Sequence, residues 1–259
     1  MIKLASKLAS SDHRKLIRAA RRDLGQTFEH STVVVWEGNS PINGAPIVAV
    51  ITNLKLASEN RKTGDMAQMY IMPRDTRPVE AVNNGDDAAV CGSCPLRPVA
   101  AKIAKLQGNI IDACYVNKGW IGKLWDSIPN LPRLHPEIIG DYLESTGLEF
   151  REGTWGDPAA VPMWVRRELN RGRGTSYTHQ WESDWIDPNA KDFSMASVQT
   201  VDEKNAANDL GYRTYRVTSG NLEPDEILCP EITSNATCKD CGLCAGNRVQ
   251  AKNIVIRPI

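Results

Sequence analysis

Residues Phe193–Val217, FSMASVQTVDEKNAANDLGYRTYRV, contain one complete strand–helix–strand pattern. The short apolar runs at Phe193–Val198 and Tyr212–Val217 predict two strands. Between them, Asp202 is expected to cap a helix that Gly211 ends. Strands and helices that alternate at this spacing are typical of parallel β/α units.

The same alternation continues over most of residues 86–259. The other expected helices are Pro95–Gln107, Gly119–Ser127, His135–Ser145 and Asp157–Asn170, and the other expected strands are Asn109–Cys114, Leu148–Glu152, Gly174–Thr178 and Asn253–Arg257. The leading prediction is an α/β protein with a mostly parallel (β/α) barrel-like fold, incomplete or distorted. A doubly wound open sheet is the alternative.

Residues 1–85 are predicted to be a β-rich part with a leading helix within Met1–Arg22. The β-branched runs Thr32–Trp36 and Pro46–Thr52 are separated by turn-forming residues and predict a hairpin. Ala67–Met72 is a third expected strand. A chain of 259 residues is within the range of one large α/β domain, so residues 1–259 are expected to form a single domain.

The composition is that of an ordinary globular protein, with 41% hydrophobic and 24% charged residues. Lys plus Arg and Asp plus Glu both total 31, so no overall field favours nucleic acid or an anionic membrane. No apolar run approaches the roughly 20 residues of a membrane span, and the first residues lack the apolar run of a signal peptide. A cytoplasmic location without a membrane partner is therefore expected.

Four of the seven cysteines lie between residues 229 and 244, and we refer to Cys229, Cys238, Cys241 and Cys244 as the C-terminal cysteine group. An odd total and a reducing compartment disfavour disulfides. Zinc sites usually use two separated C-x2-C pairs, whereas C-x2-C-x2-C is the spacing by which ferredoxins hold a [4Fe–4S] cluster. Cys229-Pro230 supplies the remote fourth ligand. The cluster is favoured, and zinc, free thiols and redox pairs stay open.

The second cysteine group consists of Cys91, Cys94 and Cys114. Three thiolates on a cluster would leave one iron open to a substrate, so catalysis would be expected here. Buried core cysteines are the structural alternative, because free Cys is among the most buried residue types. A single centre that draws ligands from both groups is a third interpretation.

Two further residues are weaker candidates for a catalytic role. Asp157 is expected after a strand and at a helix start, where it would orient a ligand, act as a base or simply cap the helix. His179 follows another expected strand and would bind a metal, carry a proton or serve structure alone. No phosphate-binding loop, dinucleotide motif or nucleophilic serine motif is present.

One stretch has a weak signature of nucleic-acid binding. Arg166, Arg167, Arg171 and Arg173 are close together in sequence, and Tyr177 and Trp181 follow them. A solvated helix end is the alternative interpretation of these charges.

Several motifs together resemble a family of uncharacterised, cysteine-rich bacteriophage proteins. They are Ser58–Asp65 (SENRKTGD), Cys91–Arg97 (CGSCPLR), Cys114–Val116 (CYV), Gly153–Pro162 (GTWGDPAAVP), Tyr177–Trp181 (YTHQW), Met195–Ser197 (MAS) and the final C-x2-C-x2-C. The family is distantly similar to radical-S-adenosylmethionine-like barrel proteins. The resemblance implies a viral protein with an iron–sulfur cluster and a barrel-like fold in the cytoplasm of the infected host.

The expected function is therefore that of an iron–sulfur protein whose cluster serves electron transfer, with a redox partner in the host cell, or structural stabilisation. A radical-S-adenosylmethionine-like or other cluster-dependent enzyme is the first alternative. The chain departs from the radical enzymes because it lacks C-x3-C-x2-C. A zinc-stapled module for nucleic-acid or protein interaction is the second alternative.

Overall fold

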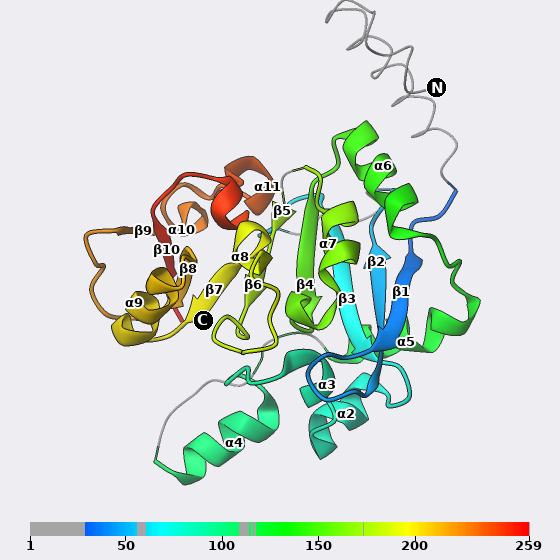
Figure 1. Cartoon of the computed structure of the whole chain (residues 1–259), viewed down its shortest axis with the longest axis horizontal. Helices are drawn as coiled ribbons and strands as arrows, with labels where there is room; N and C mark the ends of the chain where they lie inside the picture. The colour runs from blue at the N-terminus through cyan, green and yellow to red at the C-terminus, as the bar shows by residue number, and fades with distance from the viewer. Residues whose placement is uncertain are drawn as a thin grey trace, which may run out of the picture.

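The computed structural model describes residues 29–55, 61–108, 114, 116, 118–172 and 174–258. The leading helix expected within Met1–Arg22 lies outside these ranges, as do Arg173 and all but the last residue of the strand expected at Asn109–Cys114. The described residues form a mixed α/β fold with two five-stranded sheets and ten α-helices (Figure 1). The α/β class of the prediction is confirmed.

The first sheet has the strand order β1-β2-β3-β4-β5. Its strands are β1 (Val33–Asn39), β2 (Pro46–Thr52), β3 (Ala67–Pro73), β4 (Phe150–Trp155) and β5 (Gly174–Thr175). The predicted hairpin is confirmed, because β1 pairs antiparallel with β2, with Asn39 opposite Pro46. β3 adds antiparallel to β2, and β4 and β5 follow in parallel. β2 and β3 are buried along nearly their whole length, which agrees with their continuous apolar runs.

The second sheet has the order β6-β7-β8-β10-β9, and all of its pairings are parallel. Its strands are β6 (Tyr177–Thr178), β7 (Met195–Val198), β8 (Thr214–Val217), β9 (Glu226–Leu228) and β10 (Asn253–Ile256). β7 and β8 are neighbours joined by a helix, so the strand–helix–strand unit predicted from residues 193–217 is confirmed.

The single strand expected at Gly174–Thr178 is divided between the two sheets. β5 pairs with β4, whereas β6 pairs with β7, and only Ser176 separates them. The amide of Ser176 donates to the carbonyl of Cys244 at 3.1 Å instead of to a neighbouring strand. The described strands do not show a closed barrel, so the barrel-like part of the prediction is not confirmed.

The helices are α2 (Pro78–Asn84), α3 (Ala88–Cys91), α4 (Pro98–Leu106), α5 (Lys118–Ser127), α6 (Pro136–Thr146), α7 (Met163–Leu169), α8 (Ala190–Phe193), α9 (Val201–Asp209), α10 (Pro230–Ser234) and α11 (Cys238–Cys241). Short 3-10 helices occur at η2 (Ile128–Asn130), η3 (Pro158–Ala160) and η4 (Gly246–Arg248). Figure 1 shows α2, α3 and α4 together at one end of the molecule, α6 and α7 beside the first sheet, and α9 beside the second.

Two helix predictions need correction. The helix expected from Asp157 to Asn170 is broken into η3 and α7, because Pro162 stands between them and has no amide hydrogen to continue the ladder. α9 is capped by Thr200 rather than by Asp202. Thr200 accepts from the amide of Glu203, whose carboxylate accepts in return from the amide of Thr200, which makes a complete capping box.

A buried ion pair lies where the two sheets meet. Arg166 of α7 and Glu152 of β4 are at most 1% exposed, and Arg166 Nη2 lies 2.7 Å from Glu152 Oε2. Arg166 also donates to the hydroxyl of Ser194, which lies just before β7, at 2.6 Å. The Ser194 hydroxyl in turn contacts that of Ser176 at 2.6 Å. This network joins the first sheet to the segment between β5 and β6.

Candidate metal-binding sites

The local structure around the C-terminal cysteine group consists of two short helices joined by tight turns. Cys229 precedes α10, which ends at Asn235 in a left-handed conformation. Thr237 then caps α11 by accepting from the amide of Asp240, so that Cys238 and Cys241 occupy the ends of one helical turn. Gly242 follows with φ +63°, a conformation that glycine adopts at low cost. The chain reverses its direction at Gly242, which brings Cys244 back toward the other three cysteines.

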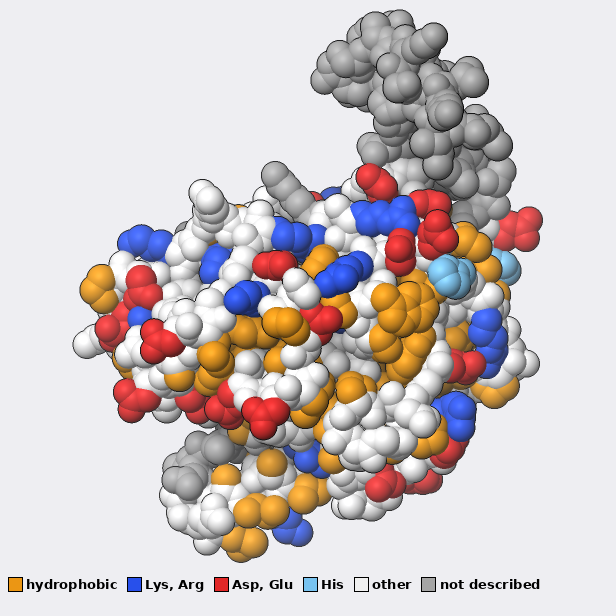
Figure 2. Space-filling model, in the orientation of Figure 1, with side chains coloured by type: hydrophobic (Ala, Val, Ile, Leu, Met, Phe, Trp, Pro, Cys, Tyr) orange, Lys and Arg blue, Asp and Glu red, His pale blue; other side chains and the backbone are white. Residues whose placement is uncertain are grey.

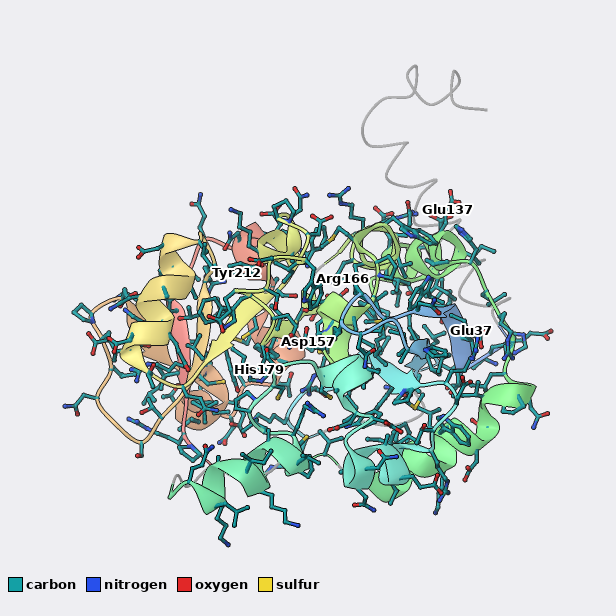
Figure 3. All side chains as sticks on the ribbon, turned by 60° about the horizontal axis from the view of Figure 1, so that its bottom comes forward. Glu37, Glu137, Asp157, Arg166, His179 and Tyr212 are labelled. Atoms are coloured by element: carbon teal, nitrogen blue, oxygen red, sulfur yellow. The ribbon has the colours of Figure 1, made fainter. Side chains whose placement is uncertain are left out.

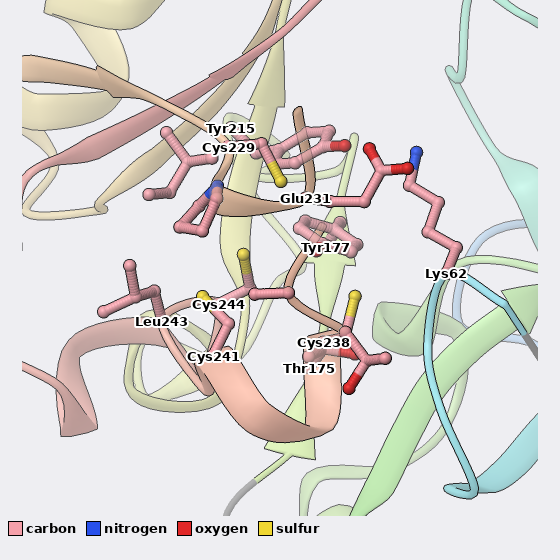
Figure 4. A pocket seen from close by; sticks show the side chains of 14 residues that line it. Lys62, Thr175, Tyr177, Tyr215, Cys229, Glu231, Cys238, Cys241, Leu243 and Cys244 are labelled. Atoms are coloured by element: carbon pink, nitrogen blue, oxygen red, sulfur yellow. The ribbon is translucent and has the colours of Figure 1, made fainter. Parts of the chain in front are cut away.

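The four cysteines of the C-terminal group line one pocket. Figure 4 shows their side chains around a common space, together with Tyr177 of β6 and Tyr215 of β8. The enclosed cavity measures about 20 Å³ and is also lined by Lys62 and Thr175. All seven cysteines lie in the described residues, and each is a free thiol in this structure. The structure therefore brings together the four residues that the sequence predicts as one ligand set.

Burial is the main influence on the pKa of three thiols in this group, those of Cys229, Cys238 and Cys244. It raises the pKa of Cys244 to about 12, against a smaller opposing effect of a hydrogen bond with Tyr177. Burial also raises the pKa of Cys238 and of Cys229, and the nearby charge of Lys62 acts against both shifts. Without a metal these thiols stay protonated at neutral pH, and a metal that binds them must displace the protons.

The wall of this pocket contains one polar atom without a partner. The hydroxyl of Thr175 is buried and forms no hydrogen bond, although Thr175 lines the pocket. Buried hydroxyls in native proteins nearly always have a partner, and an exception calls for an explanation such as a bound ion or ligand. A sulfur-rich centre among the four thiols would accept a hydrogen bond from Thr175. Thiolates and a hydroxyl donor are the groups by which proteins hold an iron–sulfur cluster and adjust its potential.

The cysteine loop is fixed by hydrogen bonds from the second sheet and from the segment before β3. The guanidinium of Arg213 donates to the carbonyls of Leu243 and Gly246 at 2.8 and 3.0 Å, on both sides of Cys244. The amide of Cys229 donates to the carbonyl of Val255 in β10 at 2.7 Å. On the opposite side, the amide of Cys238 donates to the carbonyl of Lys62 at 3.0 Å. The loop consequently joins the second sheet to the segment that precedes β3.

The arrangement does not show a site for a single metal ion. Among the residues that the structure describes, no three His, Cys, Asp or Glu side chains are grouped closely enough to hold one. A tetrahedral zinc site with Zn–S bonds of about 2.3 Å needs its sulfurs roughly 3.8 Å apart. The core of a cubane keeps its thiolate ligands farther apart than that. The predicted cofactor thus stays a prediction.

The second cysteine group lies elsewhere in the fold. Cys91 ends α3, and the amide of Cys94 donates back to its carbonyl at 3.0 Å. Cys114 is brought to the same loop, because its amide donates to the carbonyl of Leu96 at 2.7 Å. Burial raises the pKa of Cys91, to which the charges of Cys94 and Cys114 add. None of these three cysteines lines the C-terminal pocket. The structure therefore does not show one centre that draws ligands from both cysteine groups.

Gln180 holds the loop of the second cysteine group in place. Its side-chain amide donates to the carbonyl of Cys91 at 3.1 Å, and its oxygen accepts from the amide of Ser93 at 3.2 Å. Gly92 between them has φ +52°, and a side chain there would place Cβ 2.3 Å from the Gln180 oxygen. The close approach explains why a glycine is required at this position.

Asp157 and His179 lie beside each other and beside the second cysteine group (Figure 3). The Asp157 carboxylate accepts from the amides of Ala159 and His179 and from the hydroxyl of Thr178, at 2.7 to 2.9 Å. Both oxygens are therefore occupied, and the capping role that was the structural alternative is what the structure shows. Burial lowers the pKa of His179, against an opposing effect of Asp157, so its imidazole is neutral at pH 7.

Two arginines of the predicted basic stretch are paired with carboxylates. Arg166 is buried against Glu152, and Arg171 pairs with Asp141, Glu144 and Glu168. Figure 2 shows acidic and basic side chains interspersed over the visible face. In the described ranges, no helix is long and apolar enough to cross a membrane.

Several residues of these sites were not assigned a role in them from the sequence. Thr175 was only part of an expected strand, and Lys62 and Gln180 occurred only within the motifs Ser58–Asp65 and Tyr177–Trp181. Arg213 bonds to the carbonyls of Leu243 and Gly246, which are far from it in sequence. No family model, curated protein or solved structure matches the chain.

Proposed function

We propose that this protein binds a [4Fe–4S] cluster through Cys229, Cys238, Cys241 and Cys244 and serves as an electron-transfer protein. The observation that supports the proposal most strongly is the convergence of four thiols on one pocket whose wall contains the unpartnered hydroxyl of Thr175. A bound cluster of this type accepts and returns one electron. The four thiolates would use every ligand position, so this centre would have none left for a substrate.

The chain's own residues contribute donors and charge to such a centre. The hydroxyl of Thr175 would donate to a sulfur, and Tyr177 lines the same pocket and lowers the pKa of Cys244. The positive charge of Lys62 acts on Cys229 and Cys238. Hydrogen bonds and positive charge favour the reduced, more negative form and so raise the reduction potential. A redox partner in the host cytoplasm is the proposed source or acceptor of the electron.

Structural stabilisation is the second proposed role, and a different observation favours it. The cysteine loop is bonded to Val255 of the second sheet and to Lys62, which precedes β3 of the first. A centre that ties four points of this loop together would also hold the two sheets in place.

The barrel-like closure expected from sequence also stays a proposal. The strands on both sides of Ser176 are parallel, from β3 to β5 and from β6 to β9. β5 and β6 follow each other directly, so we propose that the sheets form one incomplete barrel wall.

Anaerobic reconstitution with ferrous iron and sulfide tests the main proposal. Cys241→Ser should lose about four irons and four sulfides per chain relative to the parent. Ser234→Ala is a matched control, because Ser234 is exposed and bonds only within α10 of the same loop. The control should keep its iron. Full iron content in Cys241→Ser would refute the ligand assignment, and zinc without sulfide would favour the zinc-stapled module.

A further inference from the structure

The outer surface of α6 and α7 exposes two large apolar side chains. Trp164 of α7 is 50% exposed, and Ile138 of α6 is 51% exposed. The indole of Trp164 stacks on the imidazole of His135, which precedes α6, with the ring centroids 5.9 Å apart. Ile138 follows His135 by three residues and so lies on the same side of the helix. Trp164, His135 and Ile138 therefore form one surface, which we call the α6–α7 face.

Carboxylates surround the α6–α7 face in excess. Apart from the buried Arg166, the charged side chains of α6, of α7 and of the turn after α7 are Glu137, Asp141, Glu144, Arg167, Glu168 and Arg171. The guanidinium of Arg171 contacts three of the four carboxylates at once. The fourth, Glu137, lies at the outer edge of the molecule, 3.9 Å from His135 (Figure 3). A partner that is both apolar and basic would complement this face.

The first part of the chain has this chemistry. Met1–Arg22 contains seven Lys and Arg residues and one Asp, whereas the whole chain is balanced at 31 residues of each sign. Apolar side chains lie between these charges, at Leu4, Leu8, Leu16 and Ile17. Opposite charge attracts such a segment to the face, and contact between apolar side chains adds to the affinity.

The described part of the chain begins beside α6. The carbonyl of Ser31 accepts from the amide of Leu54 at 3.0 Å, and the carbonyl of Leu54 accepts from the hydroxyl of Tyr142 in α6 at 2.9 Å. The six residues 23–28 span at most about 20 Å. The eleven residues of α6 form a helix only about 16 Å long. Met1–Arg22 is therefore attached close enough to reach the α6–α7 face of its own chain.

We propose that Met1–Arg22 binds to the α6–α7 face of its own chain. Trp164 is the central apolar contact, since exposed tryptophans often contribute most of the energy of an interface. The carboxylates of α6 receive the Lys and Arg side chains. Because the segment is tethered, its effective concentration at the face is high, so that weak individual contacts are sufficient. This contact does not depend on the proposed cluster.

Carbodiimide cross-linking of the full chain tests the proposal. The reagent joins a Lys amine to a carboxylate without a spacer, so that only groups in contact react, and mass spectrometry identifies the linked peptides. In the monomer fraction, the lysines of the segment should be joined to the carboxylates of α6, that is, Lys3, Lys7 or Lys15 to Glu137, Asp141 or Glu144. Absence of these links would overturn the proposal. Links found only in dimers would also overturn it, because the segment would then bind a second copy.

The surface of α9 is a matched control within the same molecule. It exposes Asp202 and Asp209, with Leu210 52% exposed beside them, and it lies beside the second sheet (Figure 1). Links from Lys3, Lys7 or Lys15 to α9 should be rare. Equal yields at α9 and α6 would show attraction of charge without a specific site and would overturn the proposal.

Trp164→Ala tests the apolar part of the contact. The yield of links to α6 should fall several-fold, because exposed ion pairs alone bind weakly. Trp120→Ala is the matched control, since Trp120 is 45% exposed but belongs to α5, and its yield should equal that of the parent. Circular dichroism verifies that both variants are folded. An unchanged yield in Trp164→Ala, or an equal fall in both variants, would contradict the assigned contact with Trp164.

Discussion

The backbone amide of Ser176 donates to the carbonyl of Cys244 at 3.1 Å, which fixes the last cysteine of the C-terminal group against the segment between the two sheets. The residues on either side of Ser176, Thr175 and Tyr177, both line the cysteine pocket. The point at which the chain passes from one sheet to the other is therefore also one wall of the candidate cluster site.

Removal of the Thr175 hydroxyl should lower the reduction potential of the C-terminal centre and leave its iron content unchanged. In Thr175→Val, one hydrogen bond to sulfur, worth about 1 kcal/mol, is lost. For a one-electron couple this corresponds to a shift on the order of 40 mV, measured by potentiometric titration in a chain with Cys91, Cys94 and Cys114 changed to Ser, which retains only the C-terminal cysteine group.

Thr214→Val is the matched control for this shift. Thr214 of β8 is also buried and its hydroxyl also has no partner, but the residue does not line the pocket. The reduction potential of the C-terminal centre in Thr214→Val should equal that of the parent. Equal shifts in both variants would show that the Thr175 effect comes from general repacking of the sheets.

Loss of the buried charge on Arg166 should destabilise the fold strongly. Arg166→Met leaves Glu152 buried without its ion-pair partner, which costs about 3–5 kcal/mol of the free energy of unfolding. Urea denaturation measures the change. Replacing both residues, Arg166→Met with Glu152→Leu, should recover much of the loss. A single variant within about 1 kcal/mol of the parent would contradict the assigned role of this pair.

Acid should weaken the second sheet through the pair of Arg216 and Glu226, whose closest atoms are 2.5 Å apart. Burial acts to raise the pKa of Glu226, but hydrogen bonds from Arg216 and from the amide of Glu223 outweigh it and lower the pKa below 4.5. The pair stabilises the fold fully when the pH is above 4.5, the ordinary pKa of the Glu226 carboxyl. Its contribution is lost progressively as the pH falls through the lower pKa of the folded state. In Glu226→Gln, melting temperatures should fall less steeply between about pH 5 and 3. An identical dependence of the melting temperature on pH in the variant and the parent would exclude a contribution of the Arg216–Glu226 pair.

A side chain at Gly92 should destabilise the loop of the second cysteine group. In Gly92→Ala the new Cβ would lie 2.3 Å from the Gln180 side chain, so Gln180 must shift and its hydrogen bonds to Cys91 and Ser93 weaken. The melting temperature should fall below that of the parent. Gly108→Ala is the matched control, because Gly108 also has a positive φ, of +84°, but nothing within 4 Å of a Cβ. An equal fall in both variants would point to backbone strain alone.

Sequence patterns predicted the fold best where local signals and tertiary structure agree. The unit β7-α9-β8 was recognised because its strands, helix and Gly211 each follow local rules. The strand at residues 174–178 was only partly predicted, because its division at Ser176 depends on a bond to Cys244, far away in sequence. β9 was missed because three residues are too few to form a recognisable pattern.

The candidate sites, too, could be predicted only where local sequence signals were sufficient. The spacing of Cys229, Cys238, Cys241 and Cys244 predicted one ligand set, and the structure places all four around one pocket. Asp157, a weak candidate for a catalytic role, caps η3, the structural role that its position before Pro158 already suggested. The donor Thr175 could not be predicted, because its unpartnered hydroxyl is a property of the folded surroundings.

The acid-labile sulfide content of the triple Cys91, Cys94 and Cys114→Ser variant after anaerobic reconstitution tests the central claim most directly. Sulfide is part of a cluster and of no zinc site, and this variant retains only the C-terminal cysteines. We predict about four sulfides and four irons per chain, both lost when Cys241→Ser is added. A folded variant that binds zinc, or no metal, and contains no sulfide would contradict the account.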